Sequence, residues 1–442
     1  MREIVIVIAD LYLPSASTEA GDASYGSTAH PSGSTNDAIA PNGMAGTLPG
    51  PLGLEHMARF GQRRTLDAEG GWRAWLARRL GRDDLVDVPP AVIATAAFDQ
   101  WPPPAAIEAV PSAAPSAPIE AVPSAAPSAP IEAVPSAAPS APVEVVPSAA
   151  PSAPVEAAPP ATPPASQGAT ARATGASSTA WFATPLHRIA GLTTLHLDRR
   201  SILHFSAAEA EGFAIDFNRT FGDDPTVPLR LHDFPGGSLL LEAPANVMAM
   251  TTEPARALVR GLQDSMPQGP QASAFKRLSA EVEMWLYDHP LNTFRIKRGD
   301  LPVNAFWFWG GGPIDRRPQR SPPNARGSLR LFGVDPYLAG LAGLTGGPFL
   351  NVLPKIFPDV ANTQRTVFLT QLNPLLHAHP AGSVFDAIAQ IDRRFITPAL
   401  AALHAGAVES LTLVANDIEL TIRRHDRLKF WRRFKPTLVG LR

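Results

Sequence analysis

Two aspartates stand where strands of an α/β sheet often place functional side chains. Asp10 directly follows Ile4 to Ala9, a continuous apolar run that is typical of an interior strand of a parallel sheet. Asp417 stands just beyond Ser410 to Ala415, which predicts a further strand. Ligands of open α/β sheets bind outside the carboxyl ends of the strands. Asp10 is therefore a candidate metal ligand or general base, although an aspartate there could equally cap the next turn.

A second stretch that could do chemistry is EVEMWLYDHPLNTFRIKRGDLPVNAFWFWGGG, residues 281–312, called the central block below. The spacing of its first apolar residues predicts a helix, which Pro290 is expected to end. A short polar connection follows, closed by the turn pair Gly299-Asp300, and its basic residues are Arg295, Lys297 and Arg298.

The block continues into Val303 to Trp309, which is apolar at nearly every position and predicts a strand covered on both faces. Gly310 to Gly312 are expected to end this strand and to let the backbone approach a neighbour or a ligand closely. For the two tryptophans of the strand, simple core packing is sufficient explanation. The block is thus predicted to be a helix, a basic turn, a buried strand and a glycine loop.

The elements that must position these residues alternate along the chain. Ser206 and Glu209 match a capping box and predict a helix over Ala207 to Phe221. A turn at Pro235-Gly236-Gly237 predicts a hairpin over Leu229 to Leu241. Helical patterns also cover 54–80, 254–264 and 384–403, and strand patterns cover 328–334, 349–352 and 366–372. This alternation predicts an α/β fold with a mainly parallel sheet and helices on both faces.

Two segments lack the periodicity of packed structure. Residues 14–53 are rich in Ser, Thr, Gly, Ala and Pro and predict a flexible loop. Over residues 102–180 the 12-residue unit IEAVPSAAPSAP recurs, and its prolines favour extended polyproline II, so we predict a disordered spacer. Recognition of a PxxP motif is the alternative. The predicted organisation is 1–101 and 181–442 as the two parts of one α/β domain, with 102–180 as an insert.

Composition excludes several classes of protein. The chain has 442 residues, a net charge of −2 and no cysteines, which rules out disulfides, thiolate metal sites and a cysteine nucleophile. No apolar run approaches the roughly 18 residues needed to cross a bilayer, and MREIVIVIADLYLP predicts a strand rather than a signal sequence. We therefore expect a cytoplasmic protein. Aromatic residues interleave with basic ones over 423–435, which leaves nucleic-acid or membrane-surface binding as a minor alternative.

The central block also resembles a known family. Its order HPLN, basic segment, Gly299 and VNAFWFWGGG is similar to a block in the archaeal-type cofactor-independent phosphoglycerate mutases. It is closer still to a bacterial branch of RpfE-type regulatory proteins. The resemblance covers roughly residues 1–100 and 181–442 and leaves out the repeat insert. It implies an alkaline-phosphatase-like core, a hydroxyl nucleophile, and two divalent metals, manganese or zinc, held by Asp and His at strand ends.

The residues that would carry this chemistry match the family only in part. Asp10 matches its first metal-binding Asp, although Leu11 replaces the usual glycine. The nucleophile position falls at Gly50-Pro51, which offers no hydroxyl, so the family's role would pass to a loop residue, Thr47, Ser15 or Ser17. The ligand cluster falls near LNPLLHAH, which keeps His377 and His379 without the carboxylates. The last Asp-His pair corresponds to Asp417-Ile418, and His425 matches the final histidine.

A two-metal site needs about six ligands and a nucleophile, more than this remnant supplies. We therefore expect a non-catalytic binding or regulatory protein with no cofactor, whose partner is a small phosphorylated or carboxylate ligand or another protein. Arg295 and Arg298 would clasp that ligand with planar guanidinium groups, and the remaining candidates are Asn292, Asn304, Gly310 and Gly311. Ordinary salt bridges would explain the two arginines equally well, and a tight turn would explain the two glycines. The alternative function is an active metal-dependent phosphomutase or phosphatase that uses Asp10, Asp417, His377, His379 and His425.

Overall fold

The computed structural model describes residues 2–12, 52–66, 70–98, 178–190, 195–224, 227–234, 236–320, 329–360, 362–379, 382–415 and 417–428. They belong to one compact unit formed by Met1–Pro104 and Gly175–Arg442. The loop predicted over 14–53 lies outside the described residues, except for the two that begin the first helix. The repeat predicted over 102–180 also lies outside them, except for the three that open a strand.

The larger of two main sheets contains the first strand of the chain. Its strand order is β10-β9-β11-β1-β12-β13-β2. These strands are β1 (Glu3–Ile8), β2 (Gln62–Thr65), β9 (Leu329–Phe332), β10 (Phe349–Leu350), β11 (Arg365–Thr370), β12 (Ser410–Ala415) and β13 (Ile418–Arg423). Strands β10 to β12 in this order run parallel, whereas β13 and β2 add to one edge in antiparallel pairing. The predicted mainly parallel sheet is therefore confirmed, and strand β2 within the predicted helical region 54–80 is a correction.

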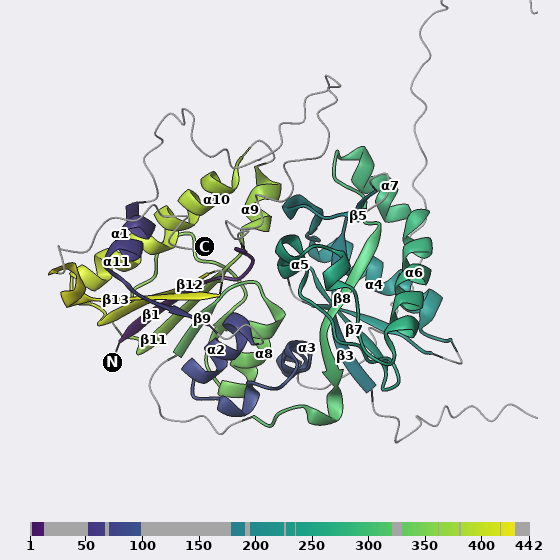
Figure 1. Ribbon diagram of the computed structural model, residues 1–442, viewed down its shortest axis with the longest axis horizontal. Helices are drawn as coiled ribbons and strands as arrows, with labels where there is room; N and C mark the ends of the chain where they lie inside the picture. The colour runs from purple at the N-terminus through teal and green to yellow at the C-terminus, as the bar shows by residue number, and fades with distance from the viewer. Residues whose placement is uncertain are drawn as a thin grey trace, which may run out of the picture. The chain divides into compact units, whose positions relative to one another are not determined.

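Helices cover both faces of this sheet. Alternate residues of β1 therefore enter two different cores, one on each face. Ile4, Ile6 and Ile8 pack in the core shared with α1 (Leu52–Phe60), α10 (Val384–Ile391) and α11 (Thr397–His404). Val5 and Val7 enter the core shared with α2 (Gly71–Arg79), α3 (Pro90–Ala94) and α8 (Pro336–Thr345). Figure 1 shows α1, α10 and α11 on one side of the sheet and α2 and α8 on the other. Helix α8 thus occupies the glycine-rich segment between the strands predicted over 328–334 and 349–352, where no helix was predicted.

The smaller sheet is antiparallel and holds the strand of the central block. Its order is β6-β7-β3-β8, formed by β6 (Arg230–Phe234), β7 (Ser238–Pro244), β3 (Ser178–Leu186) and β8 (Ala305–Pro313). Phe306 and Phe308 of β8 pack under the helices α4 (Ala207–Phe221) and α6 (Ala272–Tyr287), while Trp307 and Trp309 enter the core beside the large sheet. Both faces of β8 are buried for this reason, although its sheet is antiparallel.

Two predictions for the central block need correction. The basic connection is a helix, α7 (Pro290–Lys297), because Pro290 occupies its first turn and the His289 side chain accepts a hydrogen bond from the amide of Leu291. The strand also continues through the glycines to Pro313 instead of ending at Trp309. The predicted hairpin and the capping box of α4 are both confirmed.

The remaining elements are short. They are α5 (Pro254–Arg260), α9 (Asn373–Ala378), the strand pair β4 (Ile189–Ala190) and β5 (Leu195–His196), and a π-helical turn, Asp392–Ile396, between α10 and α11. Further 3-10 turns are Asp83–Leu85, Thr95–Ala97, Arg199–Ser201, Gln263–Ser265, Ile314–Arg316 and Arg424–Leu428. Among the described residues no helix is long and apolar enough to span a membrane.

Candidate functional site

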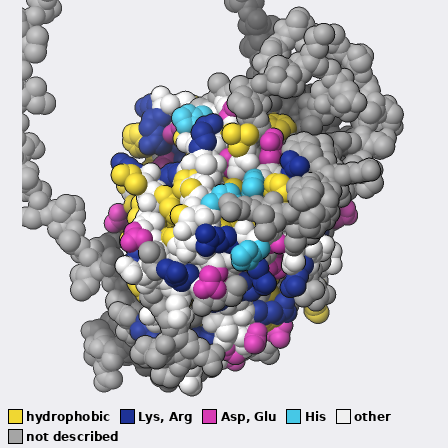
Figure 2. Space-filling model, turned by 90° about the vertical axis from the view of Figure 1, so that its left-hand side faces the viewer, with side chains coloured by type: hydrophobic (Ala, Val, Ile, Leu, Met, Phe, Trp, Pro, Cys, Tyr) yellow, Lys and Arg dark blue, Asp and Glu magenta, His cyan; other side chains and the backbone are white. Residues whose placement is uncertain are grey.

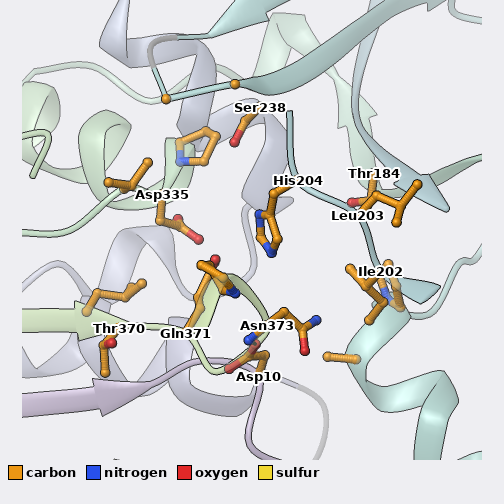
Figure 3. Close-up of a pocket in the computed structure, with 18 of the residues that line it drawn as sticks. Asp10, Thr184, Ile202, Leu203, His204, Ser238, Asp335, Thr370, Gln371 and Asn373 are labelled. Atoms are coloured by element: carbon orange, nitrogen blue, oxygen red, sulfur yellow. Dashed lines mark hydrogen bonds between the residues drawn. The ribbon is translucent and has the colours of Figure 1, made fainter. Parts of the chain in front are cut away.

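A cavity of about 360 Å³ lies at the carboxyl edge of the large sheet and is closed on its other side by the small sheet. Asp10 after β1 and Gln371 after β11 line it from one side, and Thr184 of β3 and Ser238 of β7 line it from the other. In Figure 3 the side chains of Asp335, His204 and Gln371 face the same central space. This is the edge at which open α/β sheets bind ligands, so the cavity is the candidate functional site.

Asp10 acts within the protein as a helix cap. Its two carboxylate oxygens accept the backbone N–H groups of Leu372 at 2.6 Å and Asn373 at 2.9 Å, at the start of α9. Burial raises the pKa of the Asp10 carboxyl, and these hydrogen bonds only partly oppose the shift. Asp10 therefore caps a helix that begins after β11, not the turn that follows its own strand.

Two other carboxylates at this edge, Glu253 and Asp417, pair with arginines. Arg73 of α2 contacts Glu253 at 2.9 Å, and Arg256 of α5 contacts Asp417 at 2.7 Å. Arg256 also approaches Glu253, at 3.8 Å, so the four side chains form one chain of alternating charge. All four are at most 22% exposed. Pairs this shielded are difficult to break, because each partner would be left as a buried, uncompensated charge.

Aromatic rings surround the Arg73 guanidinium. Its central carbon lies 4.3 Å from the ring of Trp72, 4.7 Å from that of Trp309 and 5.9 Å from that of Tyr337. Burial alone would lower the pKa of Arg73, but Glu253 and Asp335 outweigh it and raise the pKa. Cation–π contacts and ion pairing thus act together to hold a permanent positive charge at the edge of the cavity.

Two further titratable groups face the cavity. Asp335 caps α8 by accepting the amide of Leu338 at 3.2 Å, and burial raises the pKa of its carboxyl. Burial, followed by the nearby His377, lowers the pKa of His204 to about 4. The imidazole is exposed to the cavity, and water there reduces the cost of charging it.

Stability is expected to fall as the pH decreases from about 6.5 towards 4, in part because of His204. Above pH 6.5 His204 is neutral in both the folded and the unfolded protein. Between pH 6.5 and 4 the unfolded chain binds a proton at His204, whereas the folded protein does not, because its pKa there is lower. Urea unfolding at pH 7 and pH 5 of the native chain and of His204→Asn checks this. The loss on acidification should be smaller in the variant, and an equal loss in both proteins would contradict the expectation.

The residues predicted as metal ligands do not converge. His377 Nε2 lies 2.9 Å from the carbonyl oxygen of Ile202, and His379 is exposed at the end of α9. His425 follows β13, whose last residue pairs with the first residue of β12, so it lies at the opposite end of the sheet from Asp10 and Asp417. Among the described residues no group of three or more His, Asp or Glu side chains is placed to hold a metal. The described residues do not fit the two-metal site that the resemblance implies.

The polar residues of the central block hold that block together. Asn292 donates to the carbonyls of Leu286 and Val303, both at 2.8 Å, and accepts the amide of Val303. Asn304 bonds the backbone of Arg188 in both directions. Neither asparagine lines the cavity. Their predicted role in ligand binding stays a prediction, and their described contacts are those of structural side chains.

The two candidate arginines share one carboxylate. Arg295 contacts Glu209 at 2.7 Å and also donates to the carbonyl of Leu301, while Arg298 contacts Glu209 at 2.6 Å. Glu209 is the same residue that closes the capping box of α4. Hydrogen bonds to its Ser206 partner and to Arg298 lower the pKa of Glu209 despite its burial. The ordinary salt bridges considered as the alternative are present, and no cavity-lining role accompanies them.

Gly310 and Gly311 form a β-bulge. Ala180 pairs with Gly312 and Phe182 pairs with Trp309, so both glycines lie opposite Trp181 alone. Gly310 has a φ of +63°, which suits the first position of such a bulge. A Cβ on Gly311 would lie 2.1 Å from the Trp181 ring. The close approach predicted for these glycines is therefore made to a neighbouring side chain.

Sequence reasoning missed Arg73, Glu253, Arg256 and His204. The position of Asp335 in the sequence could have identified it as a candidate. It lies between the end of β9 and the proline that starts α8, much as Asp10 lies just beyond the end of β1. Arg73 carries none, since a basic residue between helical tryptophans is typical of many surface helices. Its place in the cavity depends on how α2 packs against the sheet.

Comparison with known proteins matches one part of this sequence. No known family model matches the sequence. A 71-residue segment, 16% of this chain, is 30% identical to a 2,3-bisphosphoglycerate-independent phosphoglycerate mutase from Methanothrix thermoacetophila. The match covers only 18% of that protein's length.

Two solved structures also show similarity. They are the cofactor-independent phosphoglycerate mutase from Thermoplasma acidophilum DSM 1728 and the PH0037 protein from Pyrococcus horikoshii. The first has a TM-score of 0.33 and 13% identity, over 100% of this chain and 94% of that one. The second has a TM-score of 0.30 and 11% identity, over 59% of this chain and 67% of that one. The matched 71-residue segment belongs to a phosphoglycerate mutase, in line with the predicted resemblance, while the RpfE-type branch stays a prediction.

Proposed function

We propose that this chain is a phosphoglycerate-mutase-like protein that binds a small ligand without turning it over and has a regulatory role. The ligand site is the cavity at the carboxyl edge of the large sheet. The binding needs no metal cofactor. The RpfE-type character and the cytoplasmic location expected from the sequence belong to the same proposal.

One observation carries the proposal: each described carboxylate at this edge already has an internal partner. Asp10 binds two backbone amides, Asp335 binds another, and Asp417 and Glu253 bind arginines. In a two-metal site the carboxylates must instead converge on the cations and be free to coordinate them. Here the fixed guanidinium groups of Arg73 and Arg256 balance the acids.

The charges of the cavity wall limit the charge of the ligand that the cavity can bind. Asp10, Glu253 and Asp335 line the cavity together with Arg73 and Arg394. Arg73 is paired with Glu253, and Arg394 donates to the carbonyls of Leu353 and Pro354. A dianionic phosphate would meet these carboxylates without a fully available cation, which is costly at short range. Of the two expected ligand classes, we therefore place a small monocarboxylate ahead of a phosphomonoester.

Asn373 adds a hydrogen-bonding requirement. It lines the cavity, and its buried Oδ1 has no donor among the described residues. Buried acceptors without a partner are rare in native proteins and often mark a place for water or a ligand. A ligand hydroxyl next to the carboxylate, or a bound water, would supply the missing donor after a small rotation of the amide.

The alternative is an active metal-dependent phosphomutase or phosphatase. The 71-residue similarity to a phosphoglycerate mutase favours it. The hydroxyl residues considered as nucleophiles, Thr47, Ser15 and Ser17, lie outside the described residues. Such an enzyme would need Asp10 and Asp417 to exchange their present partners for metal ions.

Metal content and turnover on one sample separate the two functions. We expect purified full-length protein to contain far less than one Mn²⁺ or Zn²⁺ per chain and to leave 3-phosphoglycerate and p-nitrophenyl phosphate unchanged. Asp10→Ala and Asp417→Ala are the test variants, and Asp223→Ala, which removes a side chain that is 96% exposed, is the matched control. Near-stoichiometric metal together with turnover that only the two test variants lose would overturn the proposal.

A further inference from the structure

A second hollow, of about 70 Å³, lies on the antiparallel edge of the large sheet, away from the cavity. Its lining residues are Gln62, Arg64, Arg79, Glu419, Thr421 and Arg423. Arg423 ends β13 and pairs with Ser410 at the start of β12, whereas the cavity lies where the parallel strands end. Figure 2 shows the face at this end of the molecule, with Lys and Arg side chains distributed over it.

The pairing of β2 with β13 explains why these side chains gather. Thr421 pairs with Gln62 and Glu419 pairs with Arg64. Side chains alternate between the two faces of a strand, so Gln62 and Arg64 project to the face shared with Glu419 and Thr421. Arg63 projects to the other face. The intervening β13 residues, Leu420 and Ile422, are buried in the core beneath α1.

The hollow contains more positive than negative charge. Arg79 is bound to Glu3, and Glu419 accepts hydrogen bonds from the Trp75 indole at 3.2 Å and from the Thr421 hydroxyl at 3.0 Å. The side chains of Arg64 and Arg423 make no hydrogen bond or ion pair to any other residue that the structure describes. Two guanidinium groups therefore face a small polar hollow without a fixed counter-ion, in a chain whose net charge is −2.

We propose that this hollow binds a single phosphate group. Arg64 and Arg423 would hold it with their planar donor forks, which match phosphate oxygens, and the Gln62 amide would donate a further hydrogen bond. The small volume admits one compact oxyanion and excludes the rest of a larger ligand, so only a terminal phosphate enters. Charged residues on an exposed edge strand can also serve to prevent pairing with another chain. That role would need no hollow, and Arg63 would fulfil it as well as Arg64, whereas phosphate binding requires Arg64 alone of the two.

The phosphate could be free or could belong to a lipid headgroup, and two measurements distinguish these sources. Calorimetric titration of the full-length protein with inorganic phosphate at low ionic strength tests the free ion. Co-sedimentation with vesicles of phosphatidic acid in phosphatidylcholine, against pure phosphatidylcholine, tests the headgroup. The test variants are Arg64→Gln and Arg423→Gln, and Arg63→Gln removes the same charge from the other face of the same strand.

The variants are expected to shift phosphate affinity in opposite directions. Each test variant should weaken binding roughly tenfold, the usual effect of losing a charge-assisted hydrogen bond. Arg63→Gln should change it by less than about twofold, because an exposed charge on the far face is screened. Glu419→Gln should strengthen binding by about fourfold, as expected when a like charge a few ångströms away in water is removed.

Every outcome decides the proposal. Saturable phosphate binding with this pattern supports a free phosphate group, and vesicle binding with the same pattern supports a headgroup. The absence of saturable binding in both assays overturns the proposal, as does binding that Arg64→Gln and Arg423→Gln leave unchanged. An equal loss in Arg63→Gln also overturns it, since it would indicate a diffuse positive field. None of these results depends on what occupies the cavity.

Discussion

Arg73→Met is expected to lower the free energy of unfolding by about 3–5 kcal/mol, the usual cost of removing one partner from a buried ion pair. Glu253 is 12% exposed and would lose its closest counter-charge. Asp335, whose ionised form Arg73 favours, would lose support at the same time. The contacts of the guanidinium with Trp72, Trp309 and Tyr337 would disappear as well. Equilibrium urea unfolding measures the change.

Two controls make this prediction specific to the ion pair. Arg78→Met replaces an exposed arginine on the same helix and is expected to change stability by less than about 0.5 kcal/mol. The double variant Arg73→Met, Glu253→Gln should recover part of the loss, because it removes the orphaned charge together with its partner. A single Arg73→Met variant as stable as the native chain would show that the guanidinium does not neutralise the cavity edge. A monocarboxylate would then no longer be favoured over a phosphomonoester in the cavity.

Gly311→Ala is expected to destabilise the protein by about 3 kcal/mol, at the upper end of the usual overpacking cost. The new Cβ would lie 2.1 Å from the Trp181 ring and 2.6 Å from the carbonyl oxygen of Ala180. The Trp181 side chain is fully buried, so it has no room to withdraw, and the bulge itself would have to open. Thermal and urea unfolding of the variant measure the effect.

Gly382→Ala is the matched control, because its nearest neighbour would be the carbonyl oxygen of His379 at 3.1 Å, a contact that a small backbone shift relieves. Its expected cost is below about 1 kcal/mol. A Gly311→Ala variant of native stability but altered ligand binding would favour the ligand role first predicted for this glycine. A destabilised variant would assign Gly311 to the packing of β8 against β3.

The local pattern of the sequence was sufficient for most individual elements. Ser206 and Glu209 specify the start of α4 because a capping box is made by residues three positions apart. The hairpin of β6 and β7 follows from a turn between two apolar runs. Ile4 to Ile8 specify a strand buried on both faces, and the structure places it in the centre of the large sheet. These features depend on residues that are close together in the chain.

The failed predictions have physical causes that are equally specific. Pro290 disfavours continuation of α6, as predicted, but the same residue also begins α7, because a proline in the first turn lacks only an amide that has no partner there. The glycines after Trp309 lie within β8 because neighbouring residues occupy the space that their side chains would need: Pro90 beside Gly310, Trp181 beside Gly311 and Pro89 beside Gly312. The helix α8 is capped by Asp335 despite the glycines in its sequence.

By itself the sequence determined that this is an α/β protein, that Asp10 and Asp417 each follow a strand, and that a block in its second half resembles phosphoglycerate mutases. The structure shows that the two strands are neighbours. Only the tertiary structure decided the partners of those acids. Asp10 meets amides 362 and 363 residues away, and Asp417 meets an arginine 161 residues away. A carboxylate's chemistry is set by the nearest charges and donors within a few ångströms. The packing of α5 and α9 supplies those neighbours, and no local spacing in the chain encodes them.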